Sequence, residues 1–257
     1  FLIMVSVFHV LRLSLWPIII SLAVLISFIS LYLSIKVGFN LLLLIVVLVI
    51  LNWFKDVSRE RDLLVEHRTL NNVFFKTGII LFITSEVIFF VSFFWCYFDF
   101  VLVVDIELGR VWPPKGIQRI NPFSVPLLNT IILLSSGVTI TWRHFSILNN
   151  NWYIRILTLI ITLILGIYFL CIQYQEYLDA SYTFIRRGYG RIFFLATGFH
   201  GFHVILGCIL IFARLYRIIS LSCDALRHYN FEFSAWYWHF VDVVWLFLFI
   251  FIYWWGY

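Results

Sequence analysis

The sequence predicts an all-α membrane protein with seven transmembrane helices. Hydrophobic residues make up 63% of the chain and charged residues 12%, whereas a soluble domain is nearer half apolar and a quarter charged. Apolar runs of helical length recur along the whole chain, which favours a single polytopic transmembrane domain over 1–257. The strands of an outer-membrane barrel would alternate polar and apolar residues, and these runs do not.

The first two helices are expected at 11–34 and 39–57. Trp16-Pro17 lies near the start of the first, where proline is tolerated and tryptophan suits the membrane interface. The second apolar run is only marginally long enough to cross a bilayer, so we expect its helix to continue past Lys55. The charged residues that follow have mixed signs, which is typical of a solvated helix end that could also meet lipid head groups.

The third helix, expected at 72–98, carries Glu86 near its middle. At ~1.5 Å per residue it would span ~40 Å, enough to cross a bilayer. A carboxylate at this depth costs roughly 2.5–3.5 kcal/mol on insertion scales, so it usually faces other helices or water. Glu86 is either a protonated, hydrogen-bonded packing group or a proton-handling group. Small residues at Gly78, Ser85 and Ser92 would let a neighbouring helix approach.

Four further helices follow a segment of polar residues and prolines that includes Trp112-Pro113-Pro114, a composition that stops helices. Ser135-Ser136-Gly137 offers a close-packing patch in the first of the four. These helices are expected at 123–145, 152–178, 190–217 and 233–255. Eleven Lys and Arg lie on the N-terminal side and seven on the other, which places the N-terminus inside. Because the basic residues sit in short loops, the net charge of +5 is not a nucleic-acid signal.

Two histidines three residues apart, His200 and His203, share a face of the helix expected at 190–217. They could bind a metal, since neutral imidazole is a common ligand, or hydrogen-bond within the bundle. No cysteine or second histidine pair supplies further ligands, which favours hydrogen bonding. His203 is about as deep as Glu86, so a contact between the two is geometrically feasible.

His239 and Asp242 are also three residues apart, near the start of the last helix. At this spacing they can pair on one face and lower each other's cost of burial, which favours a structural pair. The chain offers no Ser/His/Asp nucleophile arrangement, phosphate loop or haem-ligand pattern. The sequence therefore predicts no catalytic centre in this chain itself.

Seven motifs follow one another from about Trp16 to the end, and together they resemble cytochrome c oxidase subunit III. The motifs are Arg59-Glu60, Leu81-Phe-Ile-Thr-Ser-Glu-Val-Ile-Phe-Phe, Trp112-Pro-Pro-Lys-Gly, Val125-Pro-Leu-Leu-Asn-Thr, Ala196-Thr-Gly-Phe-His-Gly-Phe-His, Ala235-Trp-Tyr-Trp-His-Phe-Val-Asp-Val-Val-Trp-Leu-Phe and Tyr253-Trp-Trp-Gly. Several are long and unusual, so the resemblance is specific.

The resemblance implies a non-catalytic core subunit of the proton-pumping terminal oxidase of the respiratory chain, complex IV. Helices one and two would be split from helices three to seven by a V-shaped, lipid-filled cleft. The chain would carry no metal or haem, because haem a and copper belong to subunits I and II. It would pack on subunit I, meet subunit II and accessory subunits, and support proton uptake during electron transfer from cytochrome c to oxygen. The mitochondrial form would lie in the inner membrane, its N-terminus in the matrix and its C-terminus in the intermembrane space.

The resemblance also implies roles for single residues. Glu86 is similar to the buried carboxylate that reacts with carbodiimide, a sign of a protonated acid in an apolar site. Lipid head groups would meet Glu60, His67, Arg217, Arg227 and His228. Relatives often have two adjacent histidines where this chain has Arg227-His228. Arginine would hold phosphate bidentately at every pH, so a pH-tuned contact is not expected there.

A different class of function is a stand-alone proton or cation carrier that uses Glu86, His200, His203 and Asp242. The sequence lacks the inverted repeat and the paired interrupted helices of such carriers. A metal-dependent membrane enzyme built on the two histidines would need more ligands than the chain supplies.

Overall fold

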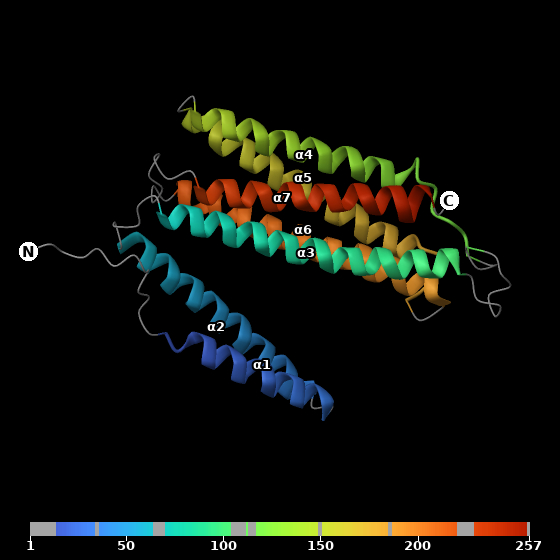
Figure 1. Cartoon of the computed structure of the whole chain (residues 1–257), viewed down its shortest axis with the longest axis horizontal. Helices are drawn as coiled ribbons and strands as arrows, with labels where there is room; N and C mark the ends of the chain where they lie inside the picture. Colours follow the sequence, from blue (N-terminus) through green and yellow to red (C-terminus); the bar gives the residue numbers. More distant parts are fainter. Residues whose placement is uncertain are drawn as a thin grey trace, which may run out of the picture. The chain divides into compact units, whose positions relative to one another are not determined.

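The computed structural model describes residues 14–33, 36–63, 70–103, 112, 117–148, 151–184, 187–219 and 229–255. It contains seven α-helices and one π-helical segment, which confirms the all-α prediction. They are α1 (Trp16–Tyr32), α2 (Lys36–Leu63), α3 (Leu70–Leu102), α4 (Val125–Leu148), α5 (Trp152–Asp179), α6 (Arg187–Ile219), α7 (Tyr229–Leu248) and η2 (Phe249–Trp254). Figure 1 shows their order along the chain.

The chain divides into two compact units, Phe1–Phe75 (unit 1) and Lys76–Tyr257 (unit 2). The division falls within the second turn of α3. The expectations of one transmembrane domain over 1–257 and of a lipid-filled cleft remain predictions.

Unit 1 contains the antiparallel pair α1 and α2. Pro17 occupies the first turn of α1, where its missing N–H removes no helical hydrogen bond. The Trp16 indole Nε1 donates to Asp56 Oδ2 at 2.9 Å and ties the start of α1 to the later part of α2. The buried residues of α1 are small, Ala23, Ser27 and Ser30, which suits close helix packing. As expected, α2 continues past Lys55.

Unit 2 is built on α4, α5, α6 and α7, in which the backbones of α4 and α5, α5 and α6, α6 and α7, and α4 and α7 lie close together (Figure 1). Two fully buried tryptophans of α7, Trp238 and Trp245, form its centre. Trp238 lies in a space kept open by two glycines: a Cβ would lie 2.7 Å from the ring at Gly166 and 2.8 Å from it at Gly207. Each indole N–H donates to α4, Trp238 to Ser136 Oγ at 2.8 Å and Trp245 to Thr130 Oγ1 at 3.0 Å.

The α3 helix packs against α6 and α7 through aromatic side chains. The ring pairs include Phe89–Phe199 at 5.1 Å, Phe90–Phe240 at 6.1 Å and Phe98–Phe251 at 5.1 Å. Large rings hold the helix axes apart, so this contact does not use the close approach that small residues permit. Within unit 2 the predicted small-residue stripe is exposed at Ser85 and Ser92, and a Cβ at Gly78 would meet nothing within 4 Å.

The helix ends differ by a few residues from most of the predicted ranges, and a local hydrogen bond explains one of these differences. The α4 helix begins at Val125 rather than at 123, since Asn121 Oδ1 accepts from the Phe123 amide at 3.0 Å and forms a turn there. The last helix begins at Tyr229, four residues before the predicted 233, and finishes as a π-helix. The α5 helix starts at Trp152 as predicted, after Asn151, whose side chain accepts from the Ile154 amide.

Five helices in the described part of the chain are long and apolar enough to cross a membrane. They lie at Phe75–Leu102, Val125–Ser146, Trp152–Asp179, Gly188–Ile219 and Phe231–Trp254. The α1 helix is a shorter apolar helix of 17 residues. All five long spans belong to unit 2, which therefore contains the polar residues singled out within the membrane.

Candidate functional site: polar pairs inside the five-helix unit

Glu86 and His203 form a direct hydrogen bond between α3 and α6, with Glu86 Oε2 2.8 Å from His203 Nε2. The contact that the sequence made feasible is therefore present. The other ring nitrogen of His203, Nδ1, lies 2.7 Å from the carbonyl of Phe199. Because a carbonyl only accepts, Nδ1 carries a hydrogen. A single proton then lies between Nε2 and Oε2, either on the carboxyl or on the imidazole.

This pair lies in the wall of an apolar groove of about 320 Å³. The Glu86 side chain is 23% exposed and that of His203 only 7%. The remaining lining residues are large and mostly aromatic: Phe82, Phe89, Phe199, Phe202, Leu206 and Tyr237. An apolar reagent could therefore reach Glu86, while the surrounding rings keep the carboxyl out of a polar medium.

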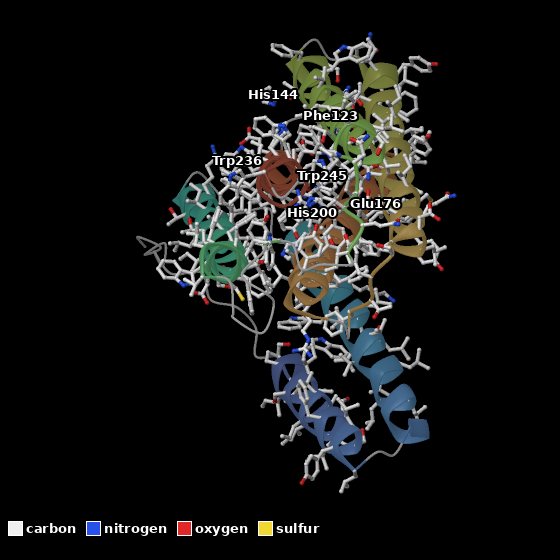
Figure 2. All side chains as sticks on the ribbon, turned by 90° about the vertical axis from the view of Figure 1, so that its right-hand side faces the viewer. Phe123, His144, Glu176, His200, Trp236 and Trp245 are labelled. Carbon is white, nitrogen blue, oxygen red and sulfur yellow. The ribbon has the colours of Figure 1, made fainter. Side chains whose placement is uncertain are left out.

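His200 has a different partner from His203. Its Nε2 donates to the carbonyl of Val241 in α7 at 3.2 Å, and its ring lies 5.2 Å from that of Trp245. Figure 2 shows His200 and Trp245 together in the interior of unit 2. The two histidines thus hydrogen-bond within the bundle, the interpretation favoured by the lack of further metal ligands in the sequence. No three His, Cys, Asp or Glu side chains within the described ranges gather closely enough to hold a metal ion.

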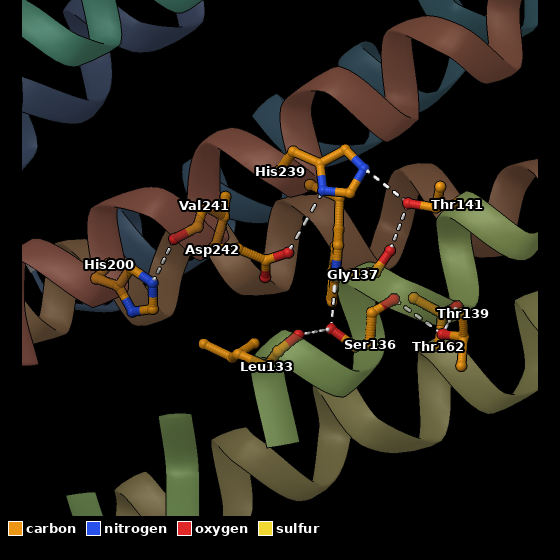
Figure 3. A network of polar contacts seen from close by, with 11 residues as sticks. Leu133, Ser136, Gly137, Thr139, Thr141, Thr162, His200, His239, Val241 and Asp242 are labelled. Atoms are coloured by element: carbon orange, nitrogen blue, oxygen red, sulfur yellow. Dashed lines mark hydrogen bonds and ion pairs between the residues drawn. The ribbon is translucent and has the colours of Figure 1, made fainter. Parts of the chain in front are cut away.

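His239 and Asp242 are brought together on α7, as their spacing predicts. His239 Nδ1 lies 3.7 Å from Asp242 Oδ2, and His239 Nε2 lies 3.4 Å from the hydroxyl of Thr141 in α4 (Figure 3). Gly137 makes the approach possible, because a Cβ there would lie 2.7 Å from Asp242 Oδ2. The Asp242 side chain is buried, whereas that of His239 is 45% exposed.

The residues expected to meet lipid head groups are only partly described. Arg217 lies in the last turn of α6, where a cation interacts favourably with the helix dipole. Glu60 belongs to α2, but its side chain is outside the described part. His67, Arg227 and His228 lie outside the described residues. The lipid contacts of all five residues remain predictions.

The structure adds another buried carboxyl group, Glu176 of α5, which was not singled out from the sequence (Figure 2). The Tyr253 hydroxyl of η2 donates to Glu176 Oε1 at 2.6 Å. Gln173 Nε2 donates to the same hydroxyl at 3.3 Å and Asn129 Nδ2 to Gln173 Oε1 at 3.2 Å. The spacing of Gln173 and Glu176 could have revealed this group from the sequence. The two residues are three positions apart in the same helix, which places both on one helix face.

Comparison with known proteins gives a consistent result over the whole chain. A family model described as "Cytochrome c oxidase subunit III" matches residues 6–257. The protein named "Cytochrome c oxidase subunit 3" in Patiria pectinifera is 47% identical over 253 residues, which cover 97% of each chain. The proteins of the same name in Aedes aegypti and Drosophila melanogaster are each 48% identical over 213 residues, covering 83% of this chain and 81% of theirs.

Proposed function

Because the chain belongs to the cytochrome c oxidase subunit III family, we propose that it is a non-catalytic core subunit of a cytochrome c oxidase. The observation that carries this proposal is similarity over nearly the full length of both chains. In the complex, haem a and copper would be held by subunits I and II. This assignment leaves the stand-alone carrier without support, since the same residues are accounted for in a subunit of a larger complex.

The main partner in this proposal is subunit I, and the His239 face of unit 2 supports a protein neighbour. His239 is half-exposed on a helix long enough to span a membrane. A polar side chain in such a helix usually faces protein or water rather than lipid. A partner helix that covers His239 would remove this cost, and subunit II and accessory subunits would cover other faces.

The chain would also bind phospholipid in the inner mitochondrial membrane, with its N-terminus in the matrix and its C-terminus in the intermembrane space. The excess of Lys and Arg on the N-terminal side supports this orientation. Glu60, His67, Arg217, Arg227 and His228 would meet the head groups on the matrix side. Arginine suits this role because its guanidinium binds phosphate with two parallel hydrogen bonds.

Support of proton uptake is assigned to the Glu86–His203 pair. A single proton lies between the two side chains in an apolar groove, so a proton can move by about a bond length without a change in net charge. This arrangement supports a proton-holding role. The same hydrogen bond also holds α3 against α6.

The subunit assignment is tested by purifying the chain in mild detergent and identifying its companions by mass spectrometry. The haem absorption spectrum is recorded before and after dissociation. We expect haem a and copper to co-purify and then to leave with the larger subunits. A chain that purifies alone, or that keeps metal after dissociation, would contradict the assignment.

A further inference from the structure

A cluster of buried oxygen atoms lies at the end of unit 2 where α5 ends and α6 begins. Glu176 is 5% exposed and Asn129 is fully buried. Two oxygens here have no hydrogen-bond partner in the described part of the protein, Glu176 Oε2 and Asn129 Oδ1. Buried polar atoms nearly always have a partner, and where protein supplies none the usual partner is an ordered water molecule.

The hydrogen-bond directions indicate which Glu176 oxygen carries a proton. The Tyr253 hydroxyl receives a hydrogen from Gln173 Nε2 and donates its own to Glu176 Oε1. Oε1 therefore acts as an acceptor, as the carbonyl oxygen of a carboxylic acid does. A proton on the carboxyl group would then belong on Oε2, the oxygen without a protein partner.

Among the described residues, the groups that face Glu176 are neutral side chains. Besides Tyr253 of η2 and Gln173 and Tyr177 of α5, they are Tyr182 after α5 and Tyr189 of α6. Burial raises the pKa of Tyr182 well above its usual value, so this phenol stays neutral.

The Arg119 guanidinium acts on two tyrosines of this region, Tyr97 and Tyr189, while the hydrogen bonds of Glu176 come from Tyr253 and Gln173. A buried carboxylate without a paired cation is costly. A neutral carboxylic acid avoids this cost and keeps a hydrogen to donate.

We propose that Glu176 is a second proton-holding carboxyl group of the bundle, which keeps its proton up to neutral pH and donates it from Oε2 to a bound water molecule. The site is distinct from the Glu86–His203 pair, because it joins α4, α5 and η2 rather than α3 and α6. Its ligand class is water, or a hydrated proton that arrives through that water.

The proposal is tested in the assembled oxidase by infrared difference spectroscopy between wild type and Glu176→Gln. Glutamine keeps the shape and the acceptor oxygen but has no carboxyl group. We expect the variant to lose one C=O stretching band of a protonated carboxylic acid, present up to neutral pH. This band should shift in D2O, since bound water exchanges its hydrogens. Glu86→Gln is the matched control and should leave the band in place.

A wild type and Glu176→Gln pair with identical carboxylic acid bands would overturn the proposal, because Glu176 would then be ionised. A band that does not shift in D2O would overturn the bound water. If Glu176→Gln does not assemble, Tyr253→Phe is the second variant: loss of the donor to Oε1 should move the band to higher frequency, and an unmoved band would count against the assignment. An experimental density map of the complex that shows no water near Glu176 Oε2 would contradict the proposed water site.

Discussion

At the scale of single residues, the Glu86–His203 pair shows how an ionisable group is kept in an apolar helix bundle. Each side chain satisfies the other, and Phe199 of the same helix as His203 satisfies the remaining ring nitrogen. The pair needs one proton between its two members, and this proton can reside on either. The geometry of the pair is compatible with both roles that the sequence left as alternatives, packing and proton holding.

The substitution Glu86→Gln separates these roles. The amide can still donate to His203 Nε2, so we expect normal assembly, but it cannot release a proton, so proton uptake should slow modestly. Uptake is measured by pH-indicator absorbance in vesicles containing the oxidase, with Asp242→Asn as the control for loss of another buried carboxyl group. Complete loss of oxidase activity in a normally assembled complex would show instead that Glu86 is obligatory.

Reaction with a carbodiimide provides a second check on the same residue. Glu86 lies in the wall of an apolar groove and is 23% exposed, whereas Glu176 is 5% exposed. We expect a hydrophobic carbodiimide to label Glu86 and to leave Glu176 unlabelled, as read by peptide mass spectrometry. Equal labelling of the two carboxyl groups would mean that the groove does not control access.

Sequence reasoning found the polar residues that stand in distinctive motifs and missed one that does not. Glu86 is a single carboxylate in a long apolar run, and His239 and Asp242 are spaced to pair. Glu176 lies near the end of its run beside Gln173 and Tyr177, where polar residues normally mark an approaching loop. Its burial depends on Tyr253, 77 positions away in sequence, and no local pattern reports such a contact.

At the scale of helices, the packing of Trp238 against two glycines decides how closely α5, α6 and α7 approach. The indole lies over Gly166 of α5 and Gly207 of α6, and Cys208 Sγ closes the same space. Interiors are packed densely, so an added methyl group forces neighbours to move. Small residues at a membrane-helix interface permit this close approach.

We expect Gly166→Ala to destabilise the subunit by about 1–3 kcal/mol, the usual cost of overpacking. Its Cβ would lie 2.7 Å from the Trp238 ring and 2.9 Å from Cys208 Sγ. Gly198→Ala on α6 is the matched control, because its Cβ would meet nothing within 4 Å. The measurement is the detergent concentration or temperature at which the subunit leaves the complex. Equal values for the two variants would show that the indole moves aside at little cost.

The existence of the helices followed from the sequence, while their boundaries did not. Runs of apolar residues long enough to span a bilayer leave few alternatives to a helix, because backbone groups in lipid must bond internally. The ends depend on individual side chains such as Asn121, whose turn delays α4. The π-helical end of α7 has no sequence signature, because an i→i+5 bond forms from the same residue types as an i→i+4 bond.

At the scale of the whole molecule, the chain is two compact units whose outer surfaces are apolar and whose polar contacts are internal. Leu, Ile, Phe and Trp side chains are exposed along the helices of both units, as expected for surfaces that meet lipid or partner subunits. Basic residues lie at the helix ends, where they can meet charged head groups.

Binding of phospholipid head groups is a property of the whole subunit in its membrane. We expect Arg217→Ala to lower the amount of anionic phospholipid that co-purifies with the oxidase, because a phosphate partner is lost at the end of α6. Arg217→Lys should retain part of the lipid, since the charge remains but the bidentate geometry does not. Lipid is measured by mass spectrometry of the purified complex, with Arg155→Ala at the start of α5 as control. Unchanged lipid in all three variants would exclude Arg217 as a head-group ligand.

The π-helical end of α7 has a consequence for the tolerated length of the chain. In η2 the Trp255 amide bonds to the Ile250 carbonyl at 2.8 Å, five positions back, so this turn holds one residue more than an α-helical turn. Deleting one residue between Ile250 and Ile252 would leave a continuous α-helix rather than a break. Because the removed residue is the extra one of the wide turn, the residues after it would keep nearly the same direction about the helix axis. A length variant at this point would therefore remain helical and span the membrane, with the end of the chain little rotated.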